Sequence, residues 1–124
     1  MSTTIKNTIT VDRGNNKTIK LTVYQVDGET VYDLSGATVT LYVKREIKDD
    51  NDDAIIELEG TLTDAENGEV EFYLLPAHTN SDEAKSNLKD NKLYPYEVEV
   101  VTDDVPAKYY TALRSVFIVN AQYR

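Results

Sequence analysis

The chain has 124 residues, no cysteine and a formal net charge of −9, from 13 Lys and Arg against 22 Asp and Glu. Its length predicts one domain over residues 1–124, and without cysteine neither a disulfide framework nor a thiolate metal site is available. The acidic charge argues against nucleic acid as a partner, and no apolar run approaches the length of about 18 residues that a membrane span needs.

Alternation of apolar and polar residues predicts β-strands from the start of the chain. The first three are expected around residues 9–11, over 18–26 and over 38–44. The aliphatic side chains that should face the core are Ile9, Val11, Ile19, Leu21, Val23, Val39, Leu41 and Val43. Asp27-Gly28 and Ser35-Gly36 predict the turns between these strands.

The same pattern continues beyond an acidic loop. Ile56, Leu58 and Leu62 are expected to share one further strand. Asn67-Gly68 is the strongest hairpin signal in the sequence, because this dipeptide suits a tight turn. The strand that follows it has the apolar positions Val70, Phe72 and Leu74.

Residues 75–88 interrupt the series of strands. Pro76 suits the first turn of a helix and Ser81 suits an N-cap, so one short helix or helical turn is expected to cross between two sheets. Two strands then follow, over residues 94–101 and 109–119, and a bulge is expected near residues 114–117 of the second.

Each predicted strand has a single apolar face, which must be buried against a second sheet. The sequence therefore predicts an all-β fold, an antiparallel β-sandwich of about seven strands with one short helical crossover. A small closed barrel is the alternative that the same pattern allows.

Few residues suit catalysis or metal binding. His78 is the only histidine, and nothing in the spacing brings a base, a carboxylate and an oxyanion site together around it, so we expect a surface histidine on a short helix. The acidic run 49–53 offers the oxygen ligands that Ca²⁺ prefers. However, if Asp49 were the first position of an EF-hand loop, Ala54 would stand where the loop needs glycine and Gly60 where it needs glutamate. A solvated loop is therefore the preferred interpretation.

Six glutamates at strand positions could supply carboxylate pairs for glycoside hydrolysis, namely Glu57, Glu59, Glu69, Glu71, Glu97 and Glu99. Each lies on the polar side of its strand and is expected to project into water, where it would protect sheet edges. A hydrolase would require these carboxylates or His78 to share a pocket. We therefore expect no enzyme activity, no catalytic residue, no cofactor and no metal.

Three tyrosines are candidates for a protein interface. Alternation places Tyr24, Tyr42 and Tyr73 on outward faces, and tyrosine gives a large contact area at a low entropic cost. The alternative is that these rings pack only against cross-strand neighbours.

The order of the motifs also carries a resemblance, through VDRGNNKTIKLTV, YDLSGATVTLYVKR, GTLTDAENGEVEFYLLPAHT, YPYEVEVV and ALRSVFIV. Together they resemble the immunoglobulin-like N-terminal domain of bacteriophage baseplate upper proteins and related small virion proteins, over nearly the whole chain. The most specific parts are residues 33–39 and the turn at 62–68 that leads to residues 74–77. The resemblance implies an immunoglobulin-like sandwich that builds tail, baseplate or neck structures without catalysis.

The resemblance also implies partners and a location. The partners are other phage virion proteins and further copies of the chain in a symmetric oligomer, and the protein is made in the host cytoplasm and localises to the virion. In the baseplate family a longer stalk or receptor-binding region usually follows, so a chain that ends at Arg124 is expected to be an adaptor, tail or capsid accessory (decoration) protein. A carbohydrate- or host-receptor-binding module is the alternative, and it would show a shallow groove with an aromatic floor.

Overall fold

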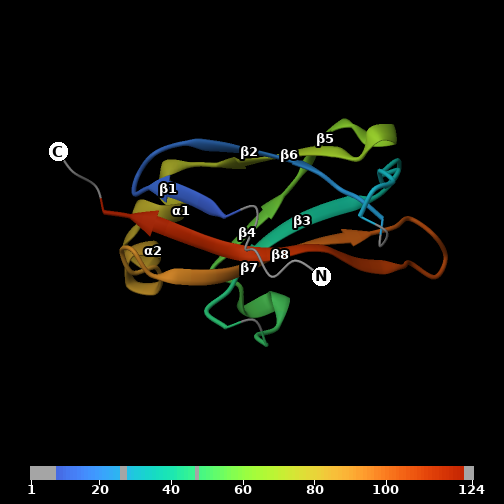
Figure 1. The fold of residues 1–124 in the computed structure, drawn as a ribbon. Coiled ribbons are helices and arrows are strands. Elements are labelled where there is room, and N and C mark those ends of the chain that lie inside the picture. Colours follow the sequence, from blue (N-terminus) through green and yellow to red (C-terminus); the bar gives the residue numbers. More distant parts are fainter. Residues whose placement is uncertain (1–7, 26–27, 47, 122–124) are drawn as a thin grey trace.

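The computed structural model describes residues 8–25, 28–46 and 48–121, which form two β-sheets that pack face to face (Figure 1). The first sheet has five strands, in the order β1 (Ile9–Asp12), β8 (Tyr109–Asn120), β7 (Leu93–Val101), β3 (Thr38–Val43) and β4 (Ile56–Glu59). The second has three, in the order β2 (Lys17–Thr22), β6 (Glu69–Leu74) and β5 (Thr61–Asp64). The predicted all-β class and the packing of two sheets are confirmed.

The core lies between the two sheets and is built mostly from the alternating apolar positions of the strands, with Leu34 and Leu88 added from the connections. Its largest fully buried side chains are Tyr96, Phe72, Phe117, Leu34, Leu41, Leu74, Leu88, Val39, Val43, Val70, Val98 and Val100. Of the aliphatic residues predicted to face inward in the first three strands, all are buried except Leu21, which is half-buried. This exception marks a place where the two sheets do not close over each other.

The strand predicted to contain both Ile56 and Leu62 is in fact two strands in different sheets, which makes eight strands in the described residues where about seven were predicted. The chain crosses from β4 to β5 at Gly60, whose N–H donates to the Val39 carbonyl over 2.7 Å. A Cβ on this glycine would lie 2.4 Å from Val70 Cγ2, so only glycine fits between the sheets here. Alternation could not predict the crossing, because the apolar period is the same on both sides of it.

The strand pairing departs from the prediction at two further points. The sandwich is not wholly antiparallel, because β1 pairs with the second half of β8 in parallel, with Ile9 opposite Phe117. The predicted bulge in β8 is present, but it lies two residues before the predicted range 114–117. The register shifts between Val98 and Glu99 of β7, so the extra residue of β8 is Ala112.

Two short helices cross between the sheets where one was predicted. Helix α1 (Pro76–Asn80) begins at the proline, and α2 (Asp82–Asn87) begins after Ser81, whose hydroxyl accepts a hydrogen bond from the Ala84 N–H over 3.1 Å. The predicted helix start and N-cap are therefore confirmed. In the part of the chain that the structure describes, no helix is long and apolar enough to span a bilayer.

The turns agree with the sequence where they are described. Residues 34–37 form a reversal that is closed by a hydrogen bond from the Ala37 N–H to the Leu34 carbonyl. Gly68 adopts a φ of 73° after the short 3₁₀ helix Ala65–Asn67, and β5 and β6 pair antiparallel on either side of it, as the hairpin signal predicted. A second 3₁₀ helix, Asn51–Asp53, lies in the acidic loop. Asp27 of the predicted Asp27-Gly28 turn lies outside the described residues, as does Val26, the predicted end of the second strand.

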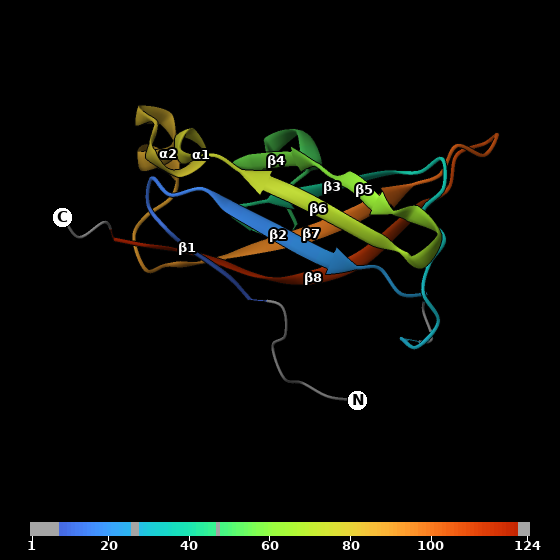
Figure 2. The ribbon, with the colours of Figure 1, turned by 90° about the horizontal axis from the view of Figure 1, so that it is seen from above.

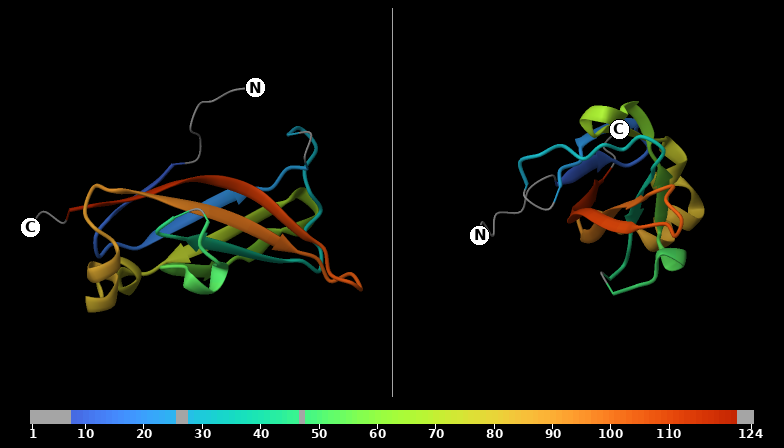
Figure 3. Two further views of the ribbon diagram at one scale, coloured as in Figure 1. Left: turned by 90° about the horizontal axis from the view of Figure 1, so that it is seen from below. Right: turned by 90° about the vertical axis from the view of Figure 1, so that its right-hand side faces the viewer.

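The helices and the longest hairpin lie at opposite ends of the molecule (Figure 2). The helices cover one end, and the β7–β8 hairpin projects at the other end, where Val105 is 99% exposed. The two long strands β7 and β8 run the length of the molecule between these ends (Figure 3). Its long sides are therefore bounded by strand edges.

Candidate functional site

The three tyrosines predicted as an interface lie on different parts of the surface. Tyr42 is half-buried on the outer face of the five-stranded sheet, and Tyr73 is 46% exposed on the outer face of the three-stranded sheet. Because the two sheets pack face to face, these outer faces point in opposite directions. Tyr24 is 43% exposed and lies just beyond β2, at the side of the molecule. The structure therefore does not bring the three rings together into one patch.

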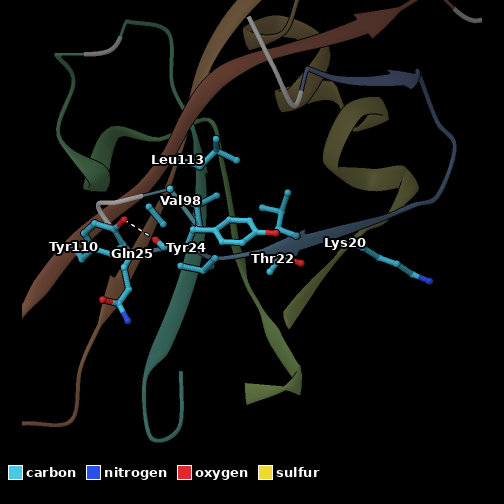
Figure 4. A pocket seen from close by; sticks show the side chains of 11 residues that line it. Lys20, Thr22, Tyr24, Gln25, Val98, Tyr110 and Leu113 are labelled. Carbon is cyan, nitrogen blue, oxygen red and sulfur yellow. Dashed lines mark hydrogen bonds between the residues drawn. The ribbon is translucent and has the colours of Figure 1, made fainter. Parts of the chain in front are cut away.

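A groove lies at that side, and we call it the open seam (Figure 4). It separates the edge of β2 and the residues after it from β7 and the first half of β8, and its volume is about 550 Å³. Its lining residues are Lys20, Leu21, Thr22, Val23, Tyr24, Gln25, Gly28, Val98, Tyr110, Ala112 and Leu113. The open seam thus exposes apolar side chains that belong to the margin of the core.

Tyr110 holds one end of the open seam in place. Its hydroxyl donates a hydrogen bond of 2.7 Å to the Tyr24 carbonyl, and its ring stacks on that of Tyr32 with 5.3 Å between the centroids. Tyr32 is in turn bound to the residue that follows β2, because its N–H donates to the Val23 carbonyl over 2.8 Å. The ring of Tyr24 extends from this junction along the groove toward Thr22 (Figure 4). This end of the groove is therefore fixed by contacts between β8 and the segment that follows β2.

The open seam adjoins a sheet edge. β1 covers only Phe117–Asn120 of β8, so no other strand of the described structure lies beside residues 109–116 on the side away from β7. Edges of this kind present a row of backbone donors and acceptors that can pair with another strand. Sequence reasoning missed this feature because alternation gives the strands but not their neighbours.

Glu97 does not project into water, as was predicted for all six glutamates. It is buried between Lys44, whose Nζ donates to Glu97 Oε1, and Arg114, whose Nε donates to Glu97 Oε2 over 3.1 Å. Burial acts to raise the pKa of Glu97, but the hydrogen bonds and charges of the two cations outweigh it and lower that pKa. Lys44 is itself only 3% exposed, although it is a charged residue at the end of a strand.

The loop over this ion pair contains the acidic run 49–53. Lys44 Nζ also donates to the Asp49 carbonyl over 2.9 Å, which fastens the loop to the end of β3. Among the residues that the structure describes, no three His, Asp or Glu side chains are grouped so that they could hold a metal ion. The loop is thus organised by a buried lysine, which the charge pattern did not predict.

His78 lies on helix α1, as predicted, and its role there is local. Its Nδ1 accepts a hydrogen bond of 2.8 Å from the Leu75 N–H, which satisfies a backbone donor at the start of the helix. The glutamates named as candidates for hydrolysis are on the strands and not on this helix. None of the salt bridges formed among the described residues involves His78.

Arg13 is a buried residue that sequence reasoning missed. Its Nε and one terminal nitrogen bind Asp90 Oδ1 over 2.9 and 2.8 Å, and its terminal nitrogens also donate to the carbonyls of Thr79 and Leu88. It thereby fastens the helical crossover to the turn between β1 and β2. These partners are 66 to 77 residues away in sequence, so no local pattern could have predicted them.

The other groups with shifted pKa values lie apart from one another. Burial raises the pKa of Tyr96 to about 12 in the core, although a hydrogen bond with Ser115 opposes it. Burial and then the charges of Glu57 and Glu99 raise the pKa of Tyr42 on one outer face. A hydrogen bond to Glu71 raises that of Tyr73 on the other.

In the turn before β3, the pKa of Asp33 is lowered and not raised. Hydrogen bonds from the Ser35 side chain and N–H lower the pKa of Asp33. The shifted groups therefore reflect separate local contacts on four parts of the molecule.

Comparisons of the chain with protein-family models and with curated proteins find no match. The open seam and the adjoining edge of β8 are thus the features on which a functional argument rests.

Proposed function

We propose that the protein is a non-enzymatic structural protein of a bacteriophage virion, which assembles into the tail, baseplate or neck by docking onto other virion proteins. The open seam carries this proposal. A groove whose apolar side chains Leu21, Ala112 and Leu113 lie beside an exposed strand edge suits a protein partner, because it offers both apolar area to bury and backbone hydrogen bonds.

The strand order supports a further part of the proposal, that the sandwich has an immunoglobulin-like topology. The three-stranded order β2-β6-β5 corresponds to strands B, E and D of an immunoglobulin domain, and β8-β7-β3-β4 corresponds to G, F, C and C′ of the variable type. The sequence motifs at residues 33–39 and 62–77, which are similar to those of the baseplate upper protein domain, support the phage part.

An antibody raised against the purified chain tests this function. Phage particles should be purified on a density gradient from a culture that produces the protein, and they should contain the chain in a fixed ratio to their other structural proteins. The expected location of the chain is the virion. Detection only in the soluble fraction of the lysate, with none in the particles, would contradict the proposal.

A pair of variants tests whether the open seam is the docking site. Tyr24→Ser removes a ring that lines the groove, whereas Tyr73→Ser removes a ring of nearly the same exposure on the outer face of the three-stranded sheet. We expect Tyr24→Ser to reduce incorporation into particles about tenfold and Tyr73→Ser to leave it unchanged. Equal incorporation of both variants would remove the open seam from the proposal.

A carbohydrate- or host-receptor-binding module is the second candidate, and one observation favours it. The ring of Tyr24 lies along a groove of ligand size beside the polar side chains of Lys20, Thr22 and Gln25 (Figure 4). A glycan array decides between the two functions. Saturable binding of a cell-wall sugar that Tyr24→Ser abolishes would favour the second candidate.

A further inference from the structure

The edges of the two sheets differ in how well they are protected against pairing with another strand. β1, β4 and β5 have four residues each, and β2 carries Lys17 and Lys20. Short strands and lysine side chains are common ways in which proteins protect an edge. The first half of β8, residues 109–116, is longer than those short strands, and its charged residue, Arg114, is bound to Glu97 on the outer face.

The direction of the backbone groups in β8 follows from two hydrogen bonds at its far end. The Val119 carbonyl accepts from the Asn91 N–H on the β7 side, and the Asn120 carbonyl accepts from the Arg13 N–H on the β1 side. Successive residues of a strand present their backbone groups to opposite sides. The register has no shift between Leu113 and Ile118, so the N–H and C=O of Arg114 face the same side as those of Asn120. They point to the open edge.

The side chains beside this edge form an apolar floor. Leu113 pairs with the fully buried Val98, so its side chain faces inward, and both residues line the open seam with Leu21 of β2. A strand added beside β8 would place every second side chain over this floor. Those side chains would complete the core margin that Leu21 leaves half-exposed.

We propose that the open edge of β8 is completed by an extended segment of a partner protein, which adds as a sixth strand beside residues 109–114 and inserts aliphatic side chains at alternate positions into the open seam. This inference rests on the proposed function and names how its docking site is filled. Backbone pairing with side-chain pockets at alternate positions is a common mode of peptide recognition.

The position of β1 and the charge of the chain define this segment further. β1 begins opposite Phe117, so an added strand ends before that point. A second copy of the chain would bring the same net charge of −9, and like charges disfavour its approach. The partner segment is therefore short, extended, and neutral or basic.

A synthetic hexapeptide is the probe, with valines that alternate with lysine or threonine and with blocked ends. We expect the full chain to bind it at concentrations below about 1 mM in an isothermal titration. Amide exchange at Arg114, followed by NMR, should slow on binding. A second peptide with glutamate in place of lysine should bind more weakly. No binding of the first peptide at this concentration would overturn the proposal.

Two variants separate strand addition from contact through side chains alone. Arg114→Pro removes an N–H on the open edge, where proline is tolerated, and Arg114→Thr removes the same charge but keeps the N–H. We expect Arg114→Pro to weaken binding about tenfold relative to Arg114→Thr, at equal thermal stability. Equal binding would contradict strand addition.

N-methylated peptides give a second measurement that needs no variant of the protein. Methylation at the valines alone or at the intervening residues alone blocks one edge of the peptide strand in each case. One of the two methylated peptides should keep its binding and the other should lose it, because only one edge pairs with β8. Binding that is unchanged by either methylation would overturn the proposal.

Two other experimental results would show that something other than a partner protein pairs with the open edge of β8. A dimer in light scattering that Arg114→Pro dissociates would assign the edge to a second copy. Binding by a variant without residues 1–7, together with none by the full chain, would assign it to the chain's own N-terminal segment. If the peptide fails to bind but Tyr24→Ser still blocks incorporation into particles, strand addition fails while the proposed function stands.

Discussion

Glu97 is connected to the acidic loop through Lys44, whose Nζ donates both to the Glu97 carboxylate and to the Asp49 carbonyl. Removing the carboxylate leaves the charge of Lys44 buried without its partner, which is costly in a low-dielectric site. We expect Glu97→Gln to lower the free energy of unfolding by about 3 kcal/mol at pH 7 in urea titrations. Glu57→Gln, an exposed carboxylate on the same face, should change it by less than about 0.5 kcal/mol.

The same residue gives a pH dependence with a defined sign. The pKa of Glu97 is lowered in the folded chain from its ordinary value of 4.5, so the unfolded chain takes up this proton first as the pH falls. The stabilisation is complete above pH 4.5 and is lost as the pH falls through the folded pKa. The gap in unfolding free energy between the native chain and Glu97→Gln should therefore narrow below pH 4.5. A gap that stays constant down to about pH 3 would contradict the lowered pKa.

Arg13 is the second residue whose contacts span the fold. A lysine in its place keeps the charge but cannot reach Asp90 and two carbonyl oxygens at once, because it lacks the planar fork of the guanidinium. We expect Arg13→Lys to lower the free energy of unfolding by about 2 kcal/mol. Hydrogen exchange should quicken in α1 and α2 before it does in β7. Uniform exchange across the chain would show that Arg13 does not fasten the helical crossover.

At the scale of elements, the passage from β4 to β5 depends on the space around Gly60. A Cβ there would meet Val70 Cγ2 and lie 3.0 Å from Phe72 Cε1, both in the packed core. We expect Gly60→Ala to lower the free energy of unfolding by about 2 kcal/mol through overpacking. Thr61→Ala, the adjacent exposed position, is the control and should stay within about 0.5 kcal/mol. Equal effects of the two substitutions on the free energy of unfolding would show that the core rearranges to accommodate a Cβ at residue 60.

The elements also show how far the sequence alone could lead. Alternation was enough to predict which side chains of β3 and β6 face the core, and turn chemistry predicted Gly68 and the Ser81 cap. Neither signal specifies which strands become neighbours. The division at Gly60, the parallel pairing of β1 and the bulge at Ala112 all depend on contacts between distant segments.

The candidate site was harder to predict than the fold for the same reason. Tyr24 was identified from its outward position, but its place beside Leu113 depends on how the two sheets meet. The sequence indicates surface positions for Lys44 and Glu97, because each lies on the polar side of its strand. Their burial comes from a partner 53 residues away and from the loop above them.

At the scale of the whole molecule, the open seam makes the sandwich unequal on its two long sides. One side ends in the four-residue strands β4 and β5, and the other exposes the first half of β8 above an apolar groove. Under the proposed function, this difference sets the direction in which the module docks. Many copies around a symmetric particle would then present the same edge to the same kind of neighbour.

Hydrogen exchange of the assembled chain tests most directly whether this edge is the contact surface. The amides of residues 109–114 and of β2 should exchange more slowly in the particle than in the isolated chain, while those of β4 and β5 keep their rates. Slower exchange confined to the outer faces around Tyr42 or Tyr73, with the edge of β8 unchanged, would contradict the account.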